Sequence, residues 1–262
     1  MLGKLMKYEF MAMGRVFLPL FGALIAVSIV NRLLALLPQM APVTIGRVLS
    51  GVLIASILVL SLILTFQRFR KNLLSDEGYL MMTLPVSTDS LILSKLFVAA
   101  IFYFASMIVV TLSISIMTLT WVSWRELFEF FMDIHIQFVD QPLETIVYII
   151  NIFVITTLST FAGILMLYIC MALSMLVNKR RGLFTFGAFI VISTTLQILF
   201  AISISIIAIL SIEEFFEDLF SLMSDFATIQ VVLLIFSMII LALCTVFYFI
   251  TRHMLKNRLN LQ

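Results

Sequence analysis

The chain has 262 residues, of which 63% are hydrophobic and 11% are charged, with a formal net charge of +2 and a mean hydropathy of +1.22. Soluble domains carry about 25% charged residues, so this composition excludes an ordinary soluble domain and indicates an integral membrane protein. We also expect no nucleic-acid partner.

The chain opens with a segment, residues 1–14, that is predicted to form a short amphipathic helix at the membrane interface. The apolar residues that share one of its faces are Leu2, Leu5, Met6, Phe10 and Met13. Lys4 and Lys7 lie off this face, where they can meet anionic lipid. We do not expect a cleavable signal peptide, because the apolar stretch that follows is long and lacks a convincing small-x-small cleavage site.

Six apolar stretches then predict an all-α, polytopic protein that forms a single transmembrane domain over residues 1–262. A helix needs roughly 20 apolar residues to cross the hydrocarbon core, and lipid cannot satisfy an open backbone. The predicted spans are Val16–Leu37, Val48–Phe66, Leu96–Thr120, Thr145–Val177, Leu183–Leu210 and Val231–Ile250. No stretch alternates with the period of two that a membrane β-barrel needs.

The basic and acidic residues between these spans lie mostly on opposite sides of the membrane. Of the sixteen Lys and Arg residues, all except Arg32, Arg47 and Arg125 lie on one side of a six-span arrangement. Most of the fourteen acidic residues lie on the other side; the exceptions are Glu9, Asp76, Glu77 and Asp89. By the positive-inside rule the basic side is cytoplasmic, which predicts that the N and C termini are both cytoplasmic.

The loop between the second and third spans carries the most distinctive pattern. Asn72–Leu84 is predicted to form a short cytoplasmic helix, with Ser75 as a cap, Asp76 and Glu77 in its first turn, and Pro85 as its stop. Its apolar side chains either rest on lipid or mark a binding surface; they are Tyr79, Leu80, Met81, Met82 and Leu84. The residues that can cap the helix of the third span are Ser87, Thr88, Asp89 and Ser90.

The sequence gives little support to catalysis, so we expect no catalytic, metal-binding or cofactor-binding residues in this chain. His135 and His253 are its two histidines, and it has neither an H-E-x-x-H pair nor a G-x-S-x-G elbow. A G-x-x-x-x-G-K-[ST] phosphate loop is absent as well, so the chain is not an ATPase of that class. Cys170 and Cys244 lie inside spans and are interpreted as packed apolar thiols.

The predicted spans three to six contain no ionisable residue, which argues against a transporter driven by an ion gradient. Arg32, the one charge inside a predicted span, lies near its outer end, where the side chain can reach the interface. The serines and threonines of spans three and four fit either helix-to-helix hydrogen bonding or a polar lining of a substrate path.

The outer loops are predicted to contain acidic amphipathic helices. Glu126, Glu129, Asp133 and Asp140 follow a helical spacing, and Glu214, Glu217, Asp218 and Asp225 repeat the arrangement in the last outer loop. The apolar residues of the first of these helices are Phe128, Phe131, Ile134 and Phe138. Two interpretations stay open: a solvated face, or an outer gate or collecting surface for a cationic cargo such as a peptide.

Two motifs connect the chain to a known family. The segment K-Y-E-F (Lys7–Phe10) with Gly14-Arg15, and the segment L-S-D-E-G-Y-L-M-M-T-L-P-V-S (Leu74–Ser87), resemble the permease subunits of bacterial ABC exporters of the type-2 class. The likeness is greatest to small permeases of Gram-positive bacteria and covers nearly the whole chain.

The resemblance implies a multi-pass protein of the bacterial plasma membrane. Two permeases, identical or homologous, would form the membrane core, surrounded by lipid, and two ATP-binding cassette ATPase subunits would supply ATP and magnesium. The ATPases would dock on a coupling helix within 72–85, through Leu74, Asp76, Glu77, Gly78, Tyr79, Leu80, Met81, Thr83, Leu84 and Pro85.

The expected function is therefore that of the membrane subunit of an ATP-driven exporter for a peptide, drug-like or lipid-like substrate. Two alternatives remain at this level. The chain could be the substrate-binding membrane component of an uptake system, or a membrane immunity factor or scaffold that transports nothing.

Overall fold

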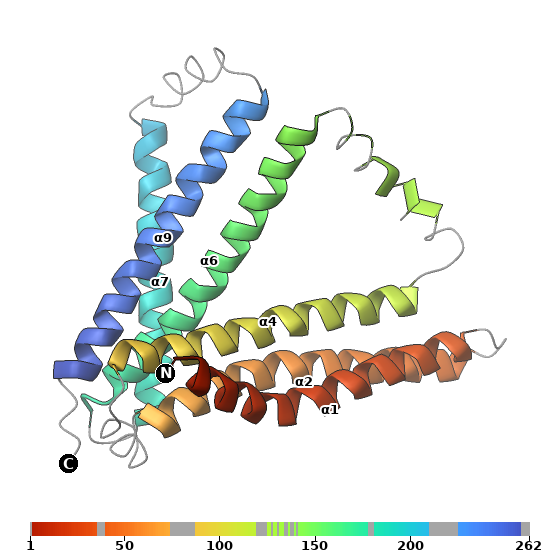
Figure 1. Ribbon diagram of the computed structural model, residues 1–262, viewed down its shortest axis with the longest axis horizontal. Coiled ribbons are helices and arrows are strands. Elements are labelled where there is room, and N and C mark those ends of the chain that lie inside the picture. The colour runs from red at the N-terminus through yellow and green to blue at the C-terminus, as the bar shows by residue number, and fades with distance from the viewer. Residues whose placement is uncertain are drawn as a thin grey trace. The chain divides into compact units, whose positions relative to one another are not determined.

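The computed structural model describes residues 2–35, 40–73, 87–118, 141–177, 181–209 and 225–257, with short pieces at 125–126, 128–129, 131–133, 136 and 139. Its long helices, in chain order, are α1 (Leu2–Leu34), α2 (Met40–Leu73), α4 (Thr88–Thr118), α6 (Pro142–Ser174), α7 (Arg181–Ile209) and α9 (Asp225–Asn257) (Figure 1). All six are long and apolar enough to cross a membrane. They confirm the predicted all-α, polytopic fold with six transmembrane helices.

The chain divides into two compact units, Met1–Asp140 and Gln141–Gln262. Each unit contains three of the six spanning helices. The prediction that these units act as one transmembrane domain stays a prediction.

The first unit is held together by the packing of α1 along α4, with α2 beside both. Phe17 is fully buried at its centre, and its ring stacks on that of Phe102 with 5.1 Å between the ring centroids. The other buried members of this core are Met13, Phe21, Leu24, Ile57 and Val98. Bonds from α1 to α4 near both ends of the pair show that the two helices run in the same direction.

The buried side chains of α1 form one stripe along the whole helix. They are Glu9, Met13, Gly14, Phe17, Phe21, Leu24, Ser28 and Asn31. Apart from Gly14, they recur every three or four residues, which is the spacing of a single helical face. The helix therefore presents the same side to α2 and α4 from its first turns to its last.

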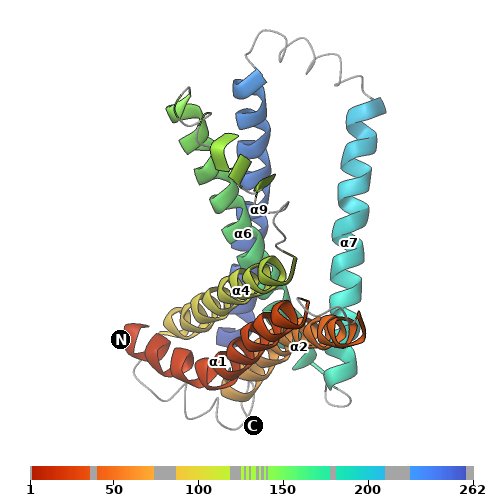
Figure 2. The same cartoon turned by 90° about the vertical axis from the view of Figure 1, so that its right-hand side faces the viewer.

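α1 differs from its prediction because it is continuous from Leu2 to Leu34 and includes the segment 1–14. The lysines of that segment are exposed, Leu2, Leu5 and Met6 are half-buried and Met13 is buried, as the amphipathic pattern predicts. Phe10, which the pattern places on the same face, is 46% exposed and departs from the prediction. Figure 2 shows that the helix changes direction along its length. Pro19 lies inside it, where the missing N–H removes one backbone hydrogen bond and favours a bend.

Polar contacts also tie the first unit at the far end of α1. The hydroxyls of Ser28 and Ser113 are hydrogen-bonded to each other, and Ser28 Oγ also donates to the Leu24 carbonyl oxygen at 2.8 Å. Asn31 is buried next to Gly46 of α2, a position where any Cβ would overlap the Asn31 side chain. A glycine at position 46 therefore lets α1 and α2 approach closely.

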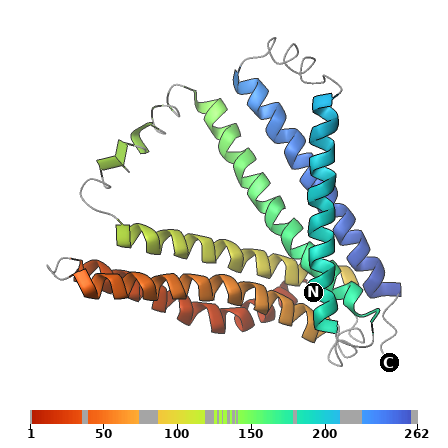
Figure 3. The same cartoon turned by 180° about the vertical axis from the view of Figure 1, so that it is seen from behind.

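The second unit repeats the plan of a first helix packed along a third. α6 and α9 run in the same direction, and α7 runs antiparallel to them and contacts α6 (Figure 3). Asn151 Nδ2 donates to Gln230 Oε1 near the beginning of α9. Further along, Cys244 Sγ donates to the Leu158 carbonyl oxygen at 3.4 Å.

The helices extend beyond the predicted spans. α4 begins at Thr88 instead of Leu96 and so includes Asp89 and Lys95. In the same way, α6 includes Glu144 and α9 includes Arg252. The predicted spans three to six contain no ionisable residue, and these charged residues lie in the parts of the helices beyond the predicted bounds, because a helix continues through the interface after the apolar run has stopped.

Candidate functional site

The loop with the most distinctive sequence pattern connects α2 to α4 within the first unit. α2 ends at Leu73 and α4 begins at Thr88. All ten residues predicted to couple to an ATPase lie outside the described residues; they are Leu74, Asp76, Glu77, Gly78, Tyr79, Leu80, Met81, Thr83, Leu84 and Pro85. The structure instead describes how the two helices that carry this loop are held.

Both margins of the loop are helical. Asn72 and Leu73 are the last residues of α2, although the sequence places them at the start of a separate helix. On the other side, Ser87 Oγ accepts a hydrogen bond from the backbone N–H of Ser90 at 3.3 Å. Ser87 therefore caps α4, which confirms one of the four predicted caps.

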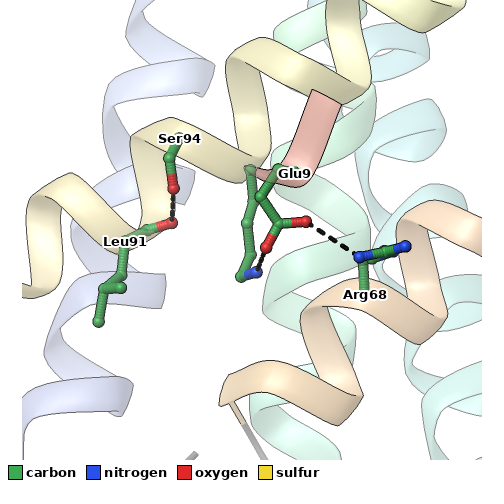
Figure 4. A network of polar contacts seen from close by, with 5 residues as sticks. Glu9, Arg68, Leu91 and Ser94 are labelled. Atoms are coloured by element: carbon green, nitrogen blue, oxygen red, sulfur yellow. Dashed lines mark hydrogen bonds and ion pairs between the residues drawn. The ribbon is translucent and has the colours of Figure 1, made fainter. Parts of the chain in front are cut away.

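A cluster of three charged side chains, Glu9, Arg68 and Lys95, lies at this same end of the unit. Lys95 Nζ donates to Glu9 Oε1, and Arg68 Nη1 lies 3.6 Å from Glu9 Oε2. Figure 4 shows the Glu9 carboxylate directed toward Arg68 on one side. We call these three residues the Glu9 cluster.

Each residue of the Glu9 cluster comes from a different helix. Glu9 lies near the start of α1, Arg68 near the end of α2 and Lys95 near the start of α4. Arg68 precedes the end of α2 by five residues, and Lys95 follows the start of α4 by seven. One carboxylate thus links the helices on both sides of the 74–86 segment.

The cluster is buried unevenly. The side chains of Lys95 and Glu9 are 3% and 10% exposed, whereas that of Arg68 is 29% exposed. Charged side chains are rarely buried unless they are paired, because the low-dielectric interior penalises an isolated charge. The Glu9–Lys95 pair is therefore the fixed part of the cluster, and Arg68 is a more solvated partner that completes it.

The sequence places Glu9, Arg68 and Lys95 on the predicted cytoplasmic side but does not predict that they meet. The sequence pattern of α1 contains one indication that Glu9 has a charged partner. Glu9 occupies the apolar face between Met6 and Met13, where a carboxylate would be isolated unless a cation lay opposite. Lys95 gives a weaker signal, since it stands directly before a long apolar run.

The Glu9 cluster links three helices through paired charges. Its carboxylate and its amine are occupied by one another, and the described residues include no group of three His, Cys, Asp or Glu side chains that could hold a metal ion. Charge-assisted contacts are stronger than neutral ones, so Glu9 connects α1 to the helix on each side of the 74–86 segment.

The predicted outer acidic helices are described in part. Arg125 Nε donates to Glu129 Oε1 at 2.8 Å, four residues along a helical turn. Phe128 and Phe131 are exposed, with 64% and 59% of their surfaces accessible. Ile134, Phe138, Asp140 and the whole of 210–224 lie outside the described residues, so the choice between a solvated face and a gate stays open.

Comparisons of the chain with protein-family models, with curated proteins and with solved structures found no match in any of the three. The class that the fold defines is a multi-pass helical membrane protein.

Proposed function

We propose that this chain is the membrane-spanning subunit of an ATP-driven ABC exporter in a bacterial plasma membrane. In this proposal a separate ATPase docks on the 72–85 segment and binds ATP and magnesium. A second membrane subunit, identical or homologous, completes the path for a peptide, drug-like or lipid-like cargo. The chain itself performs no catalysis.

The observation that carries the proposal is the position of the Glu9 cluster. A loop that only rests on lipid needs no rigid base, because lipid exerts no directed force on it. Here the helices on both sides of the loop are joined to the start of α1 through one buried carboxylate. Such a base suits a loop that receives mechanical work from a partner.

The charge pattern supports the same assignment. The basic side of the protein includes the margins of this loop, and the positive-inside rule places that side in the cytoplasm, where an ATPase is found. The apolar side chains predicted for the loop suit a docking surface, since exposed apolar patches otherwise stay small on a solvated segment.

The test is copurification of this chain with the product of the neighbouring gene, which this proposal expects to be an ATPase. The wild-type chain should retain that ATPase through solubilisation. The double variant Tyr79→Asp, Leu80→Asp should reach the membrane in equal amount and lose most of the ATPase, because two carboxylates would replace apolar contacts at the dock.

A matched variant, Phe128→Asp with Phe131→Asp, changes two exposed apolar side chains of the predicted outer surface and should retain the ATPase. Retention of the ATPase by the Tyr79→Asp, Leu80→Asp variant at the wild-type level would contradict the proposal. An uptake component or a scaffold protein would also show no ATPase bound through this segment.

A further inference from the structure

Two side-chain amides meet between α6 and α9 in the second unit, close to the beginning of α9. Asn151 Nδ2 donates to Gln230 Oε1, which satisfies the carbonyl oxygen of Gln230. Gln230 is 8% exposed, and its Nε2 is buried without a hydrogen-bond partner in the part of the chain that the structure describes. The pair therefore contains a buried N–H donor that lacks an acceptor, and such a group costs free energy until an acceptor reaches it.

The contacts around this donor join α6 to α9 within the second unit. One turn nearer the start of each helix, the rings of Tyr148 and Phe226 lie with their centroids 6.0 Å apart. Further along the pair, Cys244 Sγ donates to the Leu158 carbonyl oxygen. The donor is therefore set between two closely packed helices, next to an aromatic contact.

The depth of Gln230 in the membrane follows from the length of α9. The helix has 33 residues and is about 50 Å long at a rise of about 1.5 Å per residue, whereas the hydrocarbon core is about 30 Å thick. A centred helix thus extends about 10 Å beyond the core at each end. Gln230 follows the first residue, Asp225, by about 7.5 Å of helix, so its amide lies at the boundary between hydrocarbon and headgroups. The neighbouring tyrosine fits this depth, since tyrosine is enriched at membrane interfaces.

The acyl esters of membrane lipids lie at this boundary. An ester carbonyl oxygen accepts hydrogen bonds and brings no donor, so it matches an amide whose N–H groups are unsatisfied. A headgroup phosphate fits less well, because arginine or lysine usually recognises phosphate in proteins. α6 has neither residue, and those of α9, Arg252 and Lys256, lie at its other end.

We propose that an ester carbonyl of a membrane lipid is the acceptor for the Gln230 amide. In the predicted orientation α6 and α9 begin on the outer side, so the lipid belongs to the outer leaflet. The donor is covered in this structure, and Asn151 beside it is half-buried. The carbonyl reaches the donor when the Asn151 side chain turns aside and the two helices separate at this end. A bound lipid therefore favours separation of α6 from α9 at their first turns.

A peptide carbonyl is the competing acceptor, and the hydrogen-bond balance argues against it. A peptide brings N–H donors of its own, which need acceptors at the same place. The buried group that lacks a partner at this end of the pair is already a donor, the Nε2 of Gln230. A peptide would add to the shortage of acceptors, whereas an ester relieves it.

The lipid contact goes beyond the proposed function and does not rest on it, because it needs only this helix pair in a membrane. Failure of ATPase copurification would leave the lipid contact standing. Failure of the lipid contact would leave an ATPase partner possible.

The experiment compares two phospholipids that differ only in how their chains are linked to glycerol. Dioleoyl phosphatidylcholine carries ester carbonyls, and its dioleyl ether analogue carries none. The full-length chain, purified in detergent, is mixed with equal amounts of the two lipids, and native mass spectrometry measures which of them is bound in the complex with one lipid. We expect the ester lipid to be bound about threefold to twentyfold more, the range for one hydrogen bond in a membrane.

Two matched variants locate the preference. Gln230→Met keeps the length of the side chain and removes its N–H groups, so the preference for the ester lipid should disappear. Gln197→Met makes the same change on α7 and should keep the preference. The comparison of the two lipids on the wild-type chain needs no substitution, so it decides the proposal even if Gln230→Met does not fold.

Three outcomes would overturn the proposal. Equal binding of the two lipids by the wild-type chain would show that no ester carbonyl is recognised, since the two share one headgroup. An unchanged preference in Gln230→Met would place the recognition elsewhere. Displacement of the ester lipid by an equimolar amount of blocked trileucine peptide would show that the acceptor is a peptide carbonyl.

Discussion

At the scale of single residues, Glu9 is the side chain on which the most structure depends. It accepts a hydrogen bond from a buried lysine and attracts an arginine, and its partners belong to two other helices. Removing one member of a buried pair leaves the other charge without compensation, which costs more than the pair itself contributes.

We therefore expect Glu9→Gln to destabilise the protein strongly. The change leaves the Lys95 ammonium buried without its counter-charge, a situation that costs roughly 3–5 kcal/mol. The measurement is the thermal midpoint of the protein in lipid nanodiscs. Arg68→Gln should shift that midpoint much less, because Arg68 is partly solvated and lies 3.6 Å from the carboxylate.

A matched control exists in the predicted outer helix. Glu129 also pairs with an arginine, but its side chain is 58% exposed, so Glu129→Gln should change stability by about 1 kcal/mol or less. The double variant Glu9→Leu, Lys95→Met should recover much of the loss, since it removes both buried charges together. Equal midpoints for Glu9→Gln and Glu129→Gln would show that the buried pair has no special role.

At the scale of helices, the packing of α1 on α2 depends on a glycine. An added Cβ at Gly46 would lie 3.1 Å from Asn31 Cβ and closer still to the end of that side chain. Asn31 is 3% exposed, and its Oδ1 has no hydrogen-bond partner in the described chain. The close approach of the two helices is what confines it.

We expect Gly46→Ala to lower the stability of the first unit by about 1–3 kcal/mol, the usual cost of overpacking. Gly51→Ala is the control on the same helix, because a Cβ there meets nothing within 4 Å. Thermal unfolding of the two variants in nanodiscs compares them directly. Adding Asn31→Ala to Gly46→Ala should restore part of the stability, and an absence of any restoration would locate the strain elsewhere.

The sequence predicts the helices well and their contacts poorly. The central parts of all six spans follow from apolar length, because a membrane demands about 20 apolar residues per crossing. The ends do not follow, since α4 continues through Asp89 and Lys95 once those side chains find partners or reach the interface. A hydropathy pattern does not predict which side chains come into contact in the folded protein.

The Glu9 cluster illustrates the same limit at the candidate site. Glu9 lies 86 positions before Lys95 in the sequence, and the two meet only because of how α1, α2 and α4 pack. The sequence could flag Glu9 as an acid on an apolar face, but Lys95 and Arg68 become its partners only through tertiary packing. The ten predicted coupling residues remain predictions.

At the scale of the whole molecule, the orientation in the membrane follows from the charge partition. Cysteines placed at positions 3, 179 and 258, in a background without Cys170 and Cys244, should react with a membrane-impermeant thiol reagent only after the membrane is opened. The reason is that basic segments remain on the cytoplasmic side. Glu129→Cys should react from outside and serves as the control.

A single report of external labelling at position 3, 179 or 258 would contradict the six-span orientation. The 72–85 segment would then have no assured access to a cytoplasmic ATPase. This experiment therefore precedes any functional assay of the loop.

Native mass spectrometry of the assembly purified through a tag on this chain tests whether the chain is the membrane subunit of an ATP-driven exporter. The account predicts two membrane subunits, at least one of them this chain, with two ATPase subunits. The Tyr79→Asp, Leu80→Asp variant should yield membrane subunits without the ATPase. Recovery of this chain without any ATPase, under conditions that keep membrane assemblies intact, would contradict the account.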